Sequence, residues 1–142
     1  MREVLDGLRA WRAEGRRFAL ATVIRTWSSS PRPAGAVMAV DETGEVLGSV
    51  SGGCVEGAVH DASLRVLGTG VPEVCRFGVS TEDAFAVGLT CGGELEVYIE
   101  PVEPAAAASL DRVLDALHRS EPVVLATVLG ADRATRLVLD AT

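Results

Sequence analysis

The chain is poor in aromatic residues, which make up 4% of its 142 residues. Its core must therefore be built from Val, Leu, Ile and Ala, and a hydrophobic content of 48% is enough for one folded domain. No apolar run reaches the roughly 18 residues that a membrane-spanning helix needs. The charged N-terminal stretch also lacks the apolar centre of a signal peptide, so we expect a cytoplasmic protein.

Positive charge is scarce as well. Lys and Arg together number 13 against 20 Asp and Glu, which gives a net charge of −7. An acidic surface repels phosphate backbones, and the chain contains no basic block. We therefore expect neither a nucleic acid nor a membrane as a partner.

Only three cysteines are present, an odd number with no CxxC spacing, which argues against a disulfide framework. Cys54 and His60 fall on different faces of a predicted helix, so their spacing gives poor support for a zinc site. The GxSxG, GxxxxGK[ST] and GxGxxG patterns are also missing. The chain thus carries no common signature of a serine hydrolase or of a nucleotide-binding loop.

Hydrophobic periodicity predicts alternating helices and strands. Helices are expected at 5–14, 55–67 and 105–119, with a brief helical turn at 80–86, and strands at 18–26, 37–40, 46–50, 74–77, 94–100, 124–129 and 137–140. Hairpin-like pairs dominate this order. It favours a mixed α/β sheet with helices packed on its faces, within a single domain spanning 1–142, over a doubly wound parallel sheet.

The strand at 94–100 alternates cleanly between apolar and polar residues. Leu95, Val97 and Ile99 would face inward, and the glutamates and Tyr98 between them would face outward. This alternation is typical of a strand with one face in the core and the other in solvent.

The C-terminal part contains a candidate internal repeat. The segment 124–129, VLATVL, echoes 19–24, ALATVI, and 137–140, LVLD, echoes 38–41, MAVD. Both copies would be strand pairs, and the second lacks the Ser/Pro/Arg loop of the first. Coincidence among strands rich in Ala, Val and Leu is the alternative.

Two glycine-rich loops share a design. One reads GSVSGGCVEG and places Ser51, Gly52 and Gly53 before Cys54; the other reads GLTCGGE and places Gly92 and Gly93 after Cys91. Glycines allow close approach of a ligand, and their amides can form an anion-binding nest. Cys54 is expected in the first turn of a helix, where the dipole favours a thiolate and also a bound phosphate. Glu56 is placed to cap this helix by reaching back to Gly53.

For several other candidate residues, a purely structural role is an alternative to ligand contact. Cys75 lies in VCRF with no glycine nearby, which favours a buried thiol that packs like a small apolar side chain. Arg25 and Arg32, near the loop that includes Ser30, would add phosphate contacts or simply be exposed charges. For Cys54 and Cys91 the packing alternative is weaker, because glycine-rich settings are poor core sites.

Three segments, TWSSSPRPAGAVMAV, GSVSGGCVEGAV and FGVSTEDAFAVGLTCGGELEVYIEP, resemble the XdhC/CoxI family in matching order. The family's cysteine motifs fall on Cys54 and Cys91, and its Ser/Pro/Arg loop falls on Ser30, Pro31, Arg32 and Gly35. The resemblance implies an accessory protein that binds molybdenum cofactor and helps its sulfuration or insertion into a molybdenum hydroxylase apoenzyme. It also implies that Ser51, Gly52, Gly53, Gly92, Gly93, Ser30 and Arg32 contact the cofactor, and that Cys54 or Cys91 contacts its metal.

Many members of that family continue into a Rossmann-like C-terminal domain, which is not expected within this chain. A separate Rossmann-like chain or a homodimer would then complete the site. Two other functions stay open. One is an enzyme that handles persulfide sulfur with Cys54 as nucleophile and Glu56 or Glu94 as base. The other is an interaction module that binds no cofactor and docks on a partner oxidoreductase.

Overall fold

The computed structural model describes residues 1–28, 30–78, 93–130, 132–133 and 135–140. Its elements are η1 (Arg2–Val4), α1 (Leu5–Ala13), β1 (Phe18–Trp27), β2 (Val37–Asp41), β3 (Val46–Gly48), α2 (Glu56–Thr69), β4 (Glu73–Phe77), β5 (Glu94–Val102), η2 (Pro104–Ala106), α3 (Ala108–His118), β6 (Val123–Val128) and β7 (Thr135–Asp140). The predicted helices and strands in these ranges are present, with ends shifted by a few residues. The helical turn expected at 80–86 lies outside the described residues.

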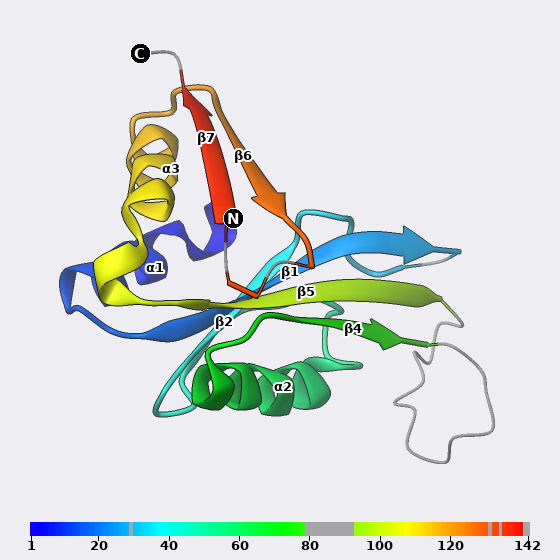
Figure 1. Cartoon of the computed structure of the whole chain (residues 1–142). Coiled ribbons are helices and arrows are strands. Elements are labelled where there is room, and N and C mark those ends of the chain that lie inside the picture. The colour runs from blue at the N-terminus through cyan, green and yellow to red at the C-terminus, as the bar shows by residue number, and fades with distance from the viewer. Residues whose placement is uncertain (29, 79–92, 131, 134, 141–142) are drawn as a thin grey trace.

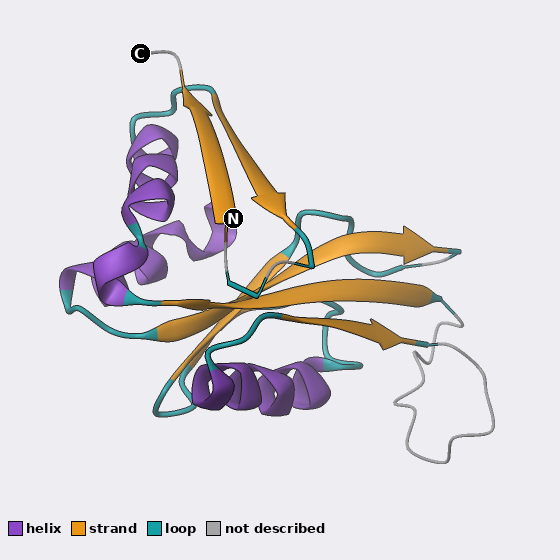
Figure 2. Cartoon of the chain, in the orientation of Figure 1, coloured by secondary structure: helices purple, strands orange, loops and turns teal. Residues whose placement is uncertain are grey.

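Five strands form one sheet in the order β3-β2-β1-β5-β4, and β6 pairs with β7 in a second, two-stranded sheet. All described strand pairs are antiparallel. Helix α2 covers one face of the larger sheet, and α1, α3 and the β6–β7 hairpin lie on the other side (Figures 1 and 2). The expected mixed α/β fold with helices packed on a sheet is confirmed.

Alternation along the strands creates two separate cores. Odd-numbered β1 residues such as Ala19 and Val23 face α2, where they pack with Val59 and Val66. Even-numbered Leu20 joins α1 and α3 on the opposite face. The remaining members of this second core are Val4, Leu8, Trp11, Phe18, Val37, Ala39, Val102, Ala107, Leu110 and Leu114. The five-stranded sheet therefore separates the molecule into two compartments.

The structure corrects the prediction that β5 is half-exposed. Leu95, Val97 and Ile99 face the α2 core as expected, but Glu96, Tyr98 and Glu100 are buried too. Glu100 is buried because Arg136 of β7 approaches it, with Nη2 2.8 Å from Oε1. The polar face of β5 is therefore buried as well. Around Glu100 it is covered by the β6–β7 hairpin, which is distant in sequence.

The repeat is real at the level of structure. Ala19 pairs with Val40 and Ala21 with Met38 in the first copy, and Val124 pairs with Leu139 and Ala126 with Leu137 in the second, so the registers are equivalent. The duplication also extends further than the sequence suggests, because each strand pair is preceded by a helix that ends in the same way.

Both helices end in a Schellman motif. In α1 the Gly15 and Arg16 amides donate to the Arg12 and Trp11 carbonyls, and in α3 the Ser120 and Glu121 amides donate to those of Leu117 and Ala116. The residues at the left-handed position are Gly15 (φ 69°) and Ser120 (φ 59°). The chain therefore contains two copies of a helix–strand–strand unit, α1-β1-β2 and α3-β6-β7.

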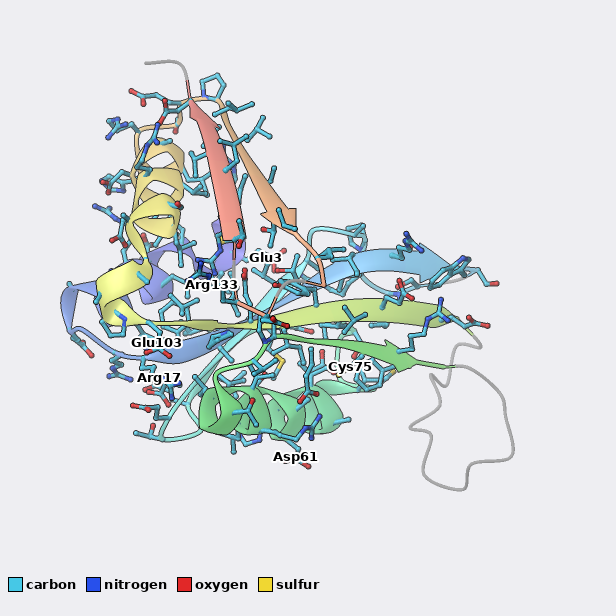
Figure 3. All side chains as sticks on the ribbon, in the orientation of Figure 1. Glu3, Arg17, Asp61, Cys75, Glu103 and Arg133 are labelled. Atoms are coloured by element: carbon cyan, nitrogen blue, oxygen red, sulfur yellow. The ribbon has the colours of Figure 1, made fainter. Side chains whose placement is uncertain are left out.

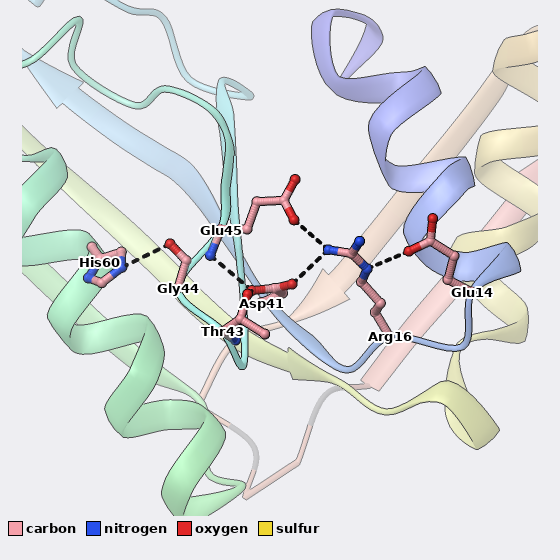
Figure 4. Close-up of polar contacts among 7 residues, drawn as sticks. All are labelled: Glu14, Arg16, Asp41, Thr43, Gly44, Glu45 and His60. Atoms are coloured by element: carbon pink, nitrogen blue, oxygen red, sulfur yellow. Dashed lines mark hydrogen bonds and ion pairs between the residues drawn. The ribbon is translucent and has the colours of Figure 1, made fainter.

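The turn between β2 and β3 is fixed by one carboxylate (Figure 4). Asp41 Oδ1 accepts the Thr43 and Glu45 amides, each at 2.9 Å, and Oδ2 accepts Arg16 Nη1 at 2.9 Å. Arg16 also binds Glu14 and Glu45. Burial tends to raise the pKa of Asp41, but these hydrogen bonds outweigh it and lower the pKa. On the left of Figure 3, Arg17 pairs with Glu103 across the ends of β1 and β5.

None of the helices in the described ranges is long and apolar enough to cross a membrane.

Candidate functional site

The loop between β3 and α2 is organised around the side chain of Glu56, the first residue of α2. Glu56 Oε1 accepts the Ser49 hydroxyl at 2.6 Å and the Val50 and Ser51 amides at 3.1 and 2.9 Å. Glu56 Oε2 accepts the Ser51 hydroxyl at 2.5 Å and the Gly53 amide at 2.8 Å. The predicted capping contact between Glu56 and Gly53 is therefore present, and it belongs to a larger set of donors.

These contacts fix the ionisation of the carboxyl group. Burial alone would raise the pKa of Glu56, but the hydrogen bonds from Ser49, Ser51 and the backbone outweigh burial and lower the pKa to about 2. Glu56 is consequently an anion at neutral pH. It occupies the amide nest that the sequence pattern suggested for a ligand phosphate, so the amides of Val50, Ser51 and Gly53 are already engaged.

Two serine hydroxyls in the loop each donate one hydrogen bond and accept another. Ser49 Oγ accepts the Gly52 amide at 2.9 Å while donating to Glu56. Ser51 Oγ accepts the Val55 amide at 3.0 Å while donating to the same carboxylate. The result is a loop whose polar groups satisfy one another, held in one conformation by a single half-buried carboxylate.

Cys54 lies just before the helix instead of in its first turn. Val55 occupies the N-cap position with φ −120° and ψ 3°, and helical geometry begins at Glu56. The Cys54 side chain is half-buried and packs against the core that α2 covers. Around it the loop is open, because a Cβ placed on Gly52 or Gly53 would meet no atom within 4 Å. The two glycines that precede Cys54 are therefore exposed to solvent.

Gly52 and Gly53 adopt φ of 77° and 126°. A side chain at either position would be strained by the backbone and not by its surroundings. The glycine pair is thus explained by the turn that brings Ser49, Ser51 and Gly53 onto one carboxylate.

The Ser30 and Arg32 loop is a separate structure. Ser30 Oγ donates to the Arg32 carbonyl at 2.8 Å, and Arg32 Nη2 donates to Glu3 Oε2 at 2.5 Å. Arg32 is therefore held against η1 by an acidic partner, and its described contacts do not include the Cys54 loop. Arg25 is exposed and lies 3.8 Å from Glu96.

The second glycine loop is described only at its edges. Cys91 and Gly92 lie outside the described residues, so their predicted contacts with the cofactor stay predictions. Gly93 precedes β5, and its carbonyl lies so close to Gly78 that a Cβ there would come within 2.1 Å. Gly78 follows β4, so the ends of the 79–92 segment meet where β4 and β5 pair. In Figure 1 this edge lies on the same side of the molecule as the start of α2.

Cys75 behaves as expected for a packing residue. It sits on β4, half-buried against the α2 core (Figure 3), and burial raises the pKa of its thiol. Over the described ranges there is no group of three or more His, Cys, Asp and Glu side chains that could hold a metal ion. Of the two described cysteines, Cys54 is the one that adjoins the exposed glycine pair.

Two features of the site are not evident from the sequence pattern. Ser49 does not stand out in it, although this residue contacts both Glu56 and Gly52. The pattern indicates Glu56 as a helix cap, and not as the acceptor for the whole loop. The sequence signal that could have revealed both features is S-x-S-G-G-x-x-E at 49–56. It places hydroxyl and amide donors just before a single acidic residue at the start of a helix.

Comparison with known proteins gives consistent results. Residues 11–78 match the model of the XdhC and CoxI family. The molybdenum cofactor insertion chaperone PaoD of Escherichia coli is 34% identical over 111 residues, which cover 78% of this chain and 34% of that protein. A protein of Bacillus subtilis named as a probable xanthine dehydrogenase subunit is 29% identical over 109 residues, covering 73% of this chain and 32% of that protein.

A crystal structure of a xanthine dehydrogenase from Bacillus halodurans superimposes with a TM-score of 0.78 at 27% identity. The match covers 95% of this chain and 41% of that one. The chain spans about a third of the length of these two curated relatives.

Proposed function

Because the chain belongs to the XdhC and CoxI family, with residues 11–78 carrying the match, we propose that it is an accessory protein for molybdenum hydroxylases. In this proposal it works in the cytoplasm, binds molybdenum cofactor as cargo and assists its sulfuration or insertion into the apoenzyme. Similarity to a protein named as a molybdenum cofactor insertion chaperone supports the choice of cargo.

The observation that carries the proposal is the preformed loop beside Cys54. A thiolate is a suitable ligand for the soft, sulfur-rich metal end of the cargo. The open space at Gly52 and Gly53 leaves room for it, and the Glu56 hydrogen bonds hold the loop in place without a ligand. Cys54 is accordingly the proposed sulfur contact, and Cys91 is a second proposed contact.

The sequence suggested the amides of the Cys54 loop as the binding site for the phosphate of the cargo, but the structure favours a different site. Three amides of the Cys54 loop already donate to Glu56, and a second anion there would be repelled. We assign the phosphate or pterin contacts to Gly92 and Gly93 and to Arg32. The Arg32 partner, Glu3, is exposed, so a ligand phosphate can compete for the guanidinium.

The enzyme alternative receives less support. Glu56 is a poor general base, because its pKa of about 2 and its five hydrogen-bond donors leave it with little tendency to take a proton from Cys54. Sulfur handling at Cys54 would then need a base from elsewhere, such as Glu94 or a partner chain.

The β6–β7 hairpin has an exposed aliphatic face. Val124, Val128, Leu137 and Leu139 are each more than half exposed. Their counterparts in the first copy, Ala19, Val23, Met38 and Val40, are buried under α2. We propose that this aliphatic face docks on the hydroxylase apoenzyme. A homodimer or a separate Rossmann-like chain on the same face, without cofactor binding, would support the interaction-module alternative instead.

The cargo proposal is tested by anaerobic equilibrium binding of molybdenum cofactor to the wild type, Cys54→Ser, Cys91→Ser and Cys75→Ser. Cys75→Ser is the matched control, because Cys75 packs against the core away from the open loop. We expect at least tenfold weaker binding for Cys54→Ser and unchanged binding for Cys75→Ser. Equal binding by wild type and Cys54→Ser would remove Cys54 from the site. No binding by the wild type would favour the interaction module.

A further inference from the structure

A cavity lies on the opposite face of the five-stranded sheet from the core against which Cys54 packs. It measures about 270 Å³ and lies between that face and the β6–β7 hairpin. Its floor is formed by adjacent residues of paired strands, because Thr22 of β1 pairs with both Val37 of β2 and Tyr98 of β5, and Leu20 pairs with Glu100. The other wall comes from β6 and the residue after it.

The two walls are copies of each other. Leu20, Thr22 and Ile24 on β1 correspond to Leu125, Thr127 and Leu129 in the second unit, and all six line the cavity. The cavity therefore sits between the duplicated units, with aliphatic side chains on two sides and one threonine in each wall. Ligand sites are common at such junctions between structural units.

Two buried polar atoms at the floor have no partner. Tyr98 and Glu100 each expose 2% of their surface, and Tyr98 Oη and Glu100 Oε2 find no hydrogen bond among the described residues. Such groups cost free energy when they are left unsatisfied in a protein interior. Both side chains lie on the same face of β5, two positions apart, and both residues line the same cavity.

The other oxygen of Glu100 defines the charge of the site. Arg136 approaches Oε1 with Nη2 at 2.8 Å and Nε at 3.1 Å, and both side chains are almost fully buried. Burial raises the pKa of Glu100 and the adjacent Arg136 opposes that rise; with both groups charged, the pair is neutral as a whole. Burial raises the pKa of Tyr98, which keeps its hydroxyl protonated and able to donate. What remains is one acceptor, Glu100 Oε2, beside one donor, Tyr98 Oη.

We propose that this cavity binds a small neutral nitrogen heterocycle by its edge. A ring N–H or amino group donates to Glu100 Oε2, and a neighbouring ring nitrogen or carbonyl oxygen accepts the Tyr98 hydroxyl. The flat ring lies between the leucine and threonine side chains of β1 and β6. At about 270 Å³ the cavity is slightly smaller than the roughly 300 Å³ at which pockets for larger ligands begin, so it suits a single small ring. This site is separate from Cys54, so it does not depend on the proposed function.

The test uses isocytosine as the probe, because its edge sets an amino group and a ring N–H beside a ring nitrogen and a carbonyl. Toluene is the apolar control of similar size. Binding to the full chain is followed by NMR shifts of the Ile24, Thr22 and Thr127 methyl groups. We expect saturable shifts with isocytosine and at least a tenfold larger Kd for Tyr98→Phe, which keeps the ring and should melt at the same temperature or higher.

A second variant, Leu125→Trp, fills the cavity while leaving Tyr98 and Glu100 intact, and it should also abolish isocytosine binding. Glu103→Gln, on the surface beside Arg17, is the control that should leave it unchanged. Shifts with toluene but none with isocytosine would overturn the proposal, as would isocytosine binding that survives both Tyr98→Phe and Leu125→Trp.

Discussion

The carboxylate of Glu56 accepts the amide of Gly53 at 2.8 Å, so the first residue of α2 closes the loop that precedes it. Four further donors from Ser49, Val50 and Ser51 converge on the same carboxylate. The conformation of the loop around Cys54 therefore depends on a side chain that is not itself in the loop.

Glu56→Gln should destabilise the protein for two reasons. It removes the negative charge, and it replaces one acceptor oxygen by an N–H₂ group that faces backbone amide and serine hydroxyl donors. Hydrogen bonds to a charged group contribute about 1.5–3 kcal/mol, so we expect the free energy of unfolding to fall by about 2 kcal/mol at pH 7. Urea denaturation measures it. Glu42→Gln, an exposed partner of Arg17, is the control and should change it by less than about 0.5 kcal/mol.

The stability difference between the wild type and Glu56→Gln should depend on pH. The pKa of Glu56 is lowered from 4.5 to about 2 in the folded state, so its contribution is complete above about pH 4.5. It is lost as the pH falls from 4.5 towards 2. The difference in stability between wild type and Glu56→Gln should therefore shrink over that window. A difference that is constant from pH 7 to pH 2.5 would contradict the assignment.

Ser120→Gly should stabilise the protein. Ser120 occupies the left-handed position of the α3 Schellman motif, where the equivalent residue of α1 is Gly15. Left-handed backbone costs a non-glycine residue about 1 kcal/mol, so relief of this strain should raise the free energy of unfolding by about 0.5–1 kcal/mol. Gly15→Ser is the reciprocal variant and should lower it. Destabilisation by Ser120→Gly in a urea titration would show that Ser120 is not strained.

The β6–β7 face provides a prediction about partners. Leu137→Lys should weaken apoenzyme binding at least tenfold without lowering the melting temperature, because the side chain is 60% exposed. Val71→Lys is the matched control, since Val71 is 48% exposed but lies after α2. Sedimentation of the chain alone should show whether Leu137→Lys also changes its oligomeric state. Unchanged apoenzyme affinity would place the docking surface elsewhere.

Periodicity was enough to predict most of the fold. The helices and strands of the described ranges follow local apolar patterns, and the echo between 19–24 and 124–129 correctly indicated two strand pairs in equivalent register. The matching helix ends were missed, because Gly15 and Ser120 share a backbone conformation and not a residue type. A shared backbone conformation between two different residue types can be recognised only from the structure.

The burial of Glu96, Tyr98 and Glu100 was not predictable from local sequence. Alternation shows that two faces differ but not what covers the polar one. Here the cover includes Arg136, which neutralises Glu100 from a strand near the other end of the chain. The hydrogen bonding of the Cys54 loop was only partly predictable for a similar reason. Glycines and Cys54 were visible as a motif, but only the fold shows that Glu56 takes the amides that a phosphate would need.

The closed hydrogen-bond set around Glu56 also bears on how a ligand would be released. A loop that is already ordered loses little conformational entropy when something binds beside it, and it regains little when that molecule leaves. Affinity at Cys54 would then be set by the direct contacts alone, with no contribution from folding of the loop. Binding and release would be similarly free of rearrangement, which suits the proposed role of a carrier that passes its cargo to another protein.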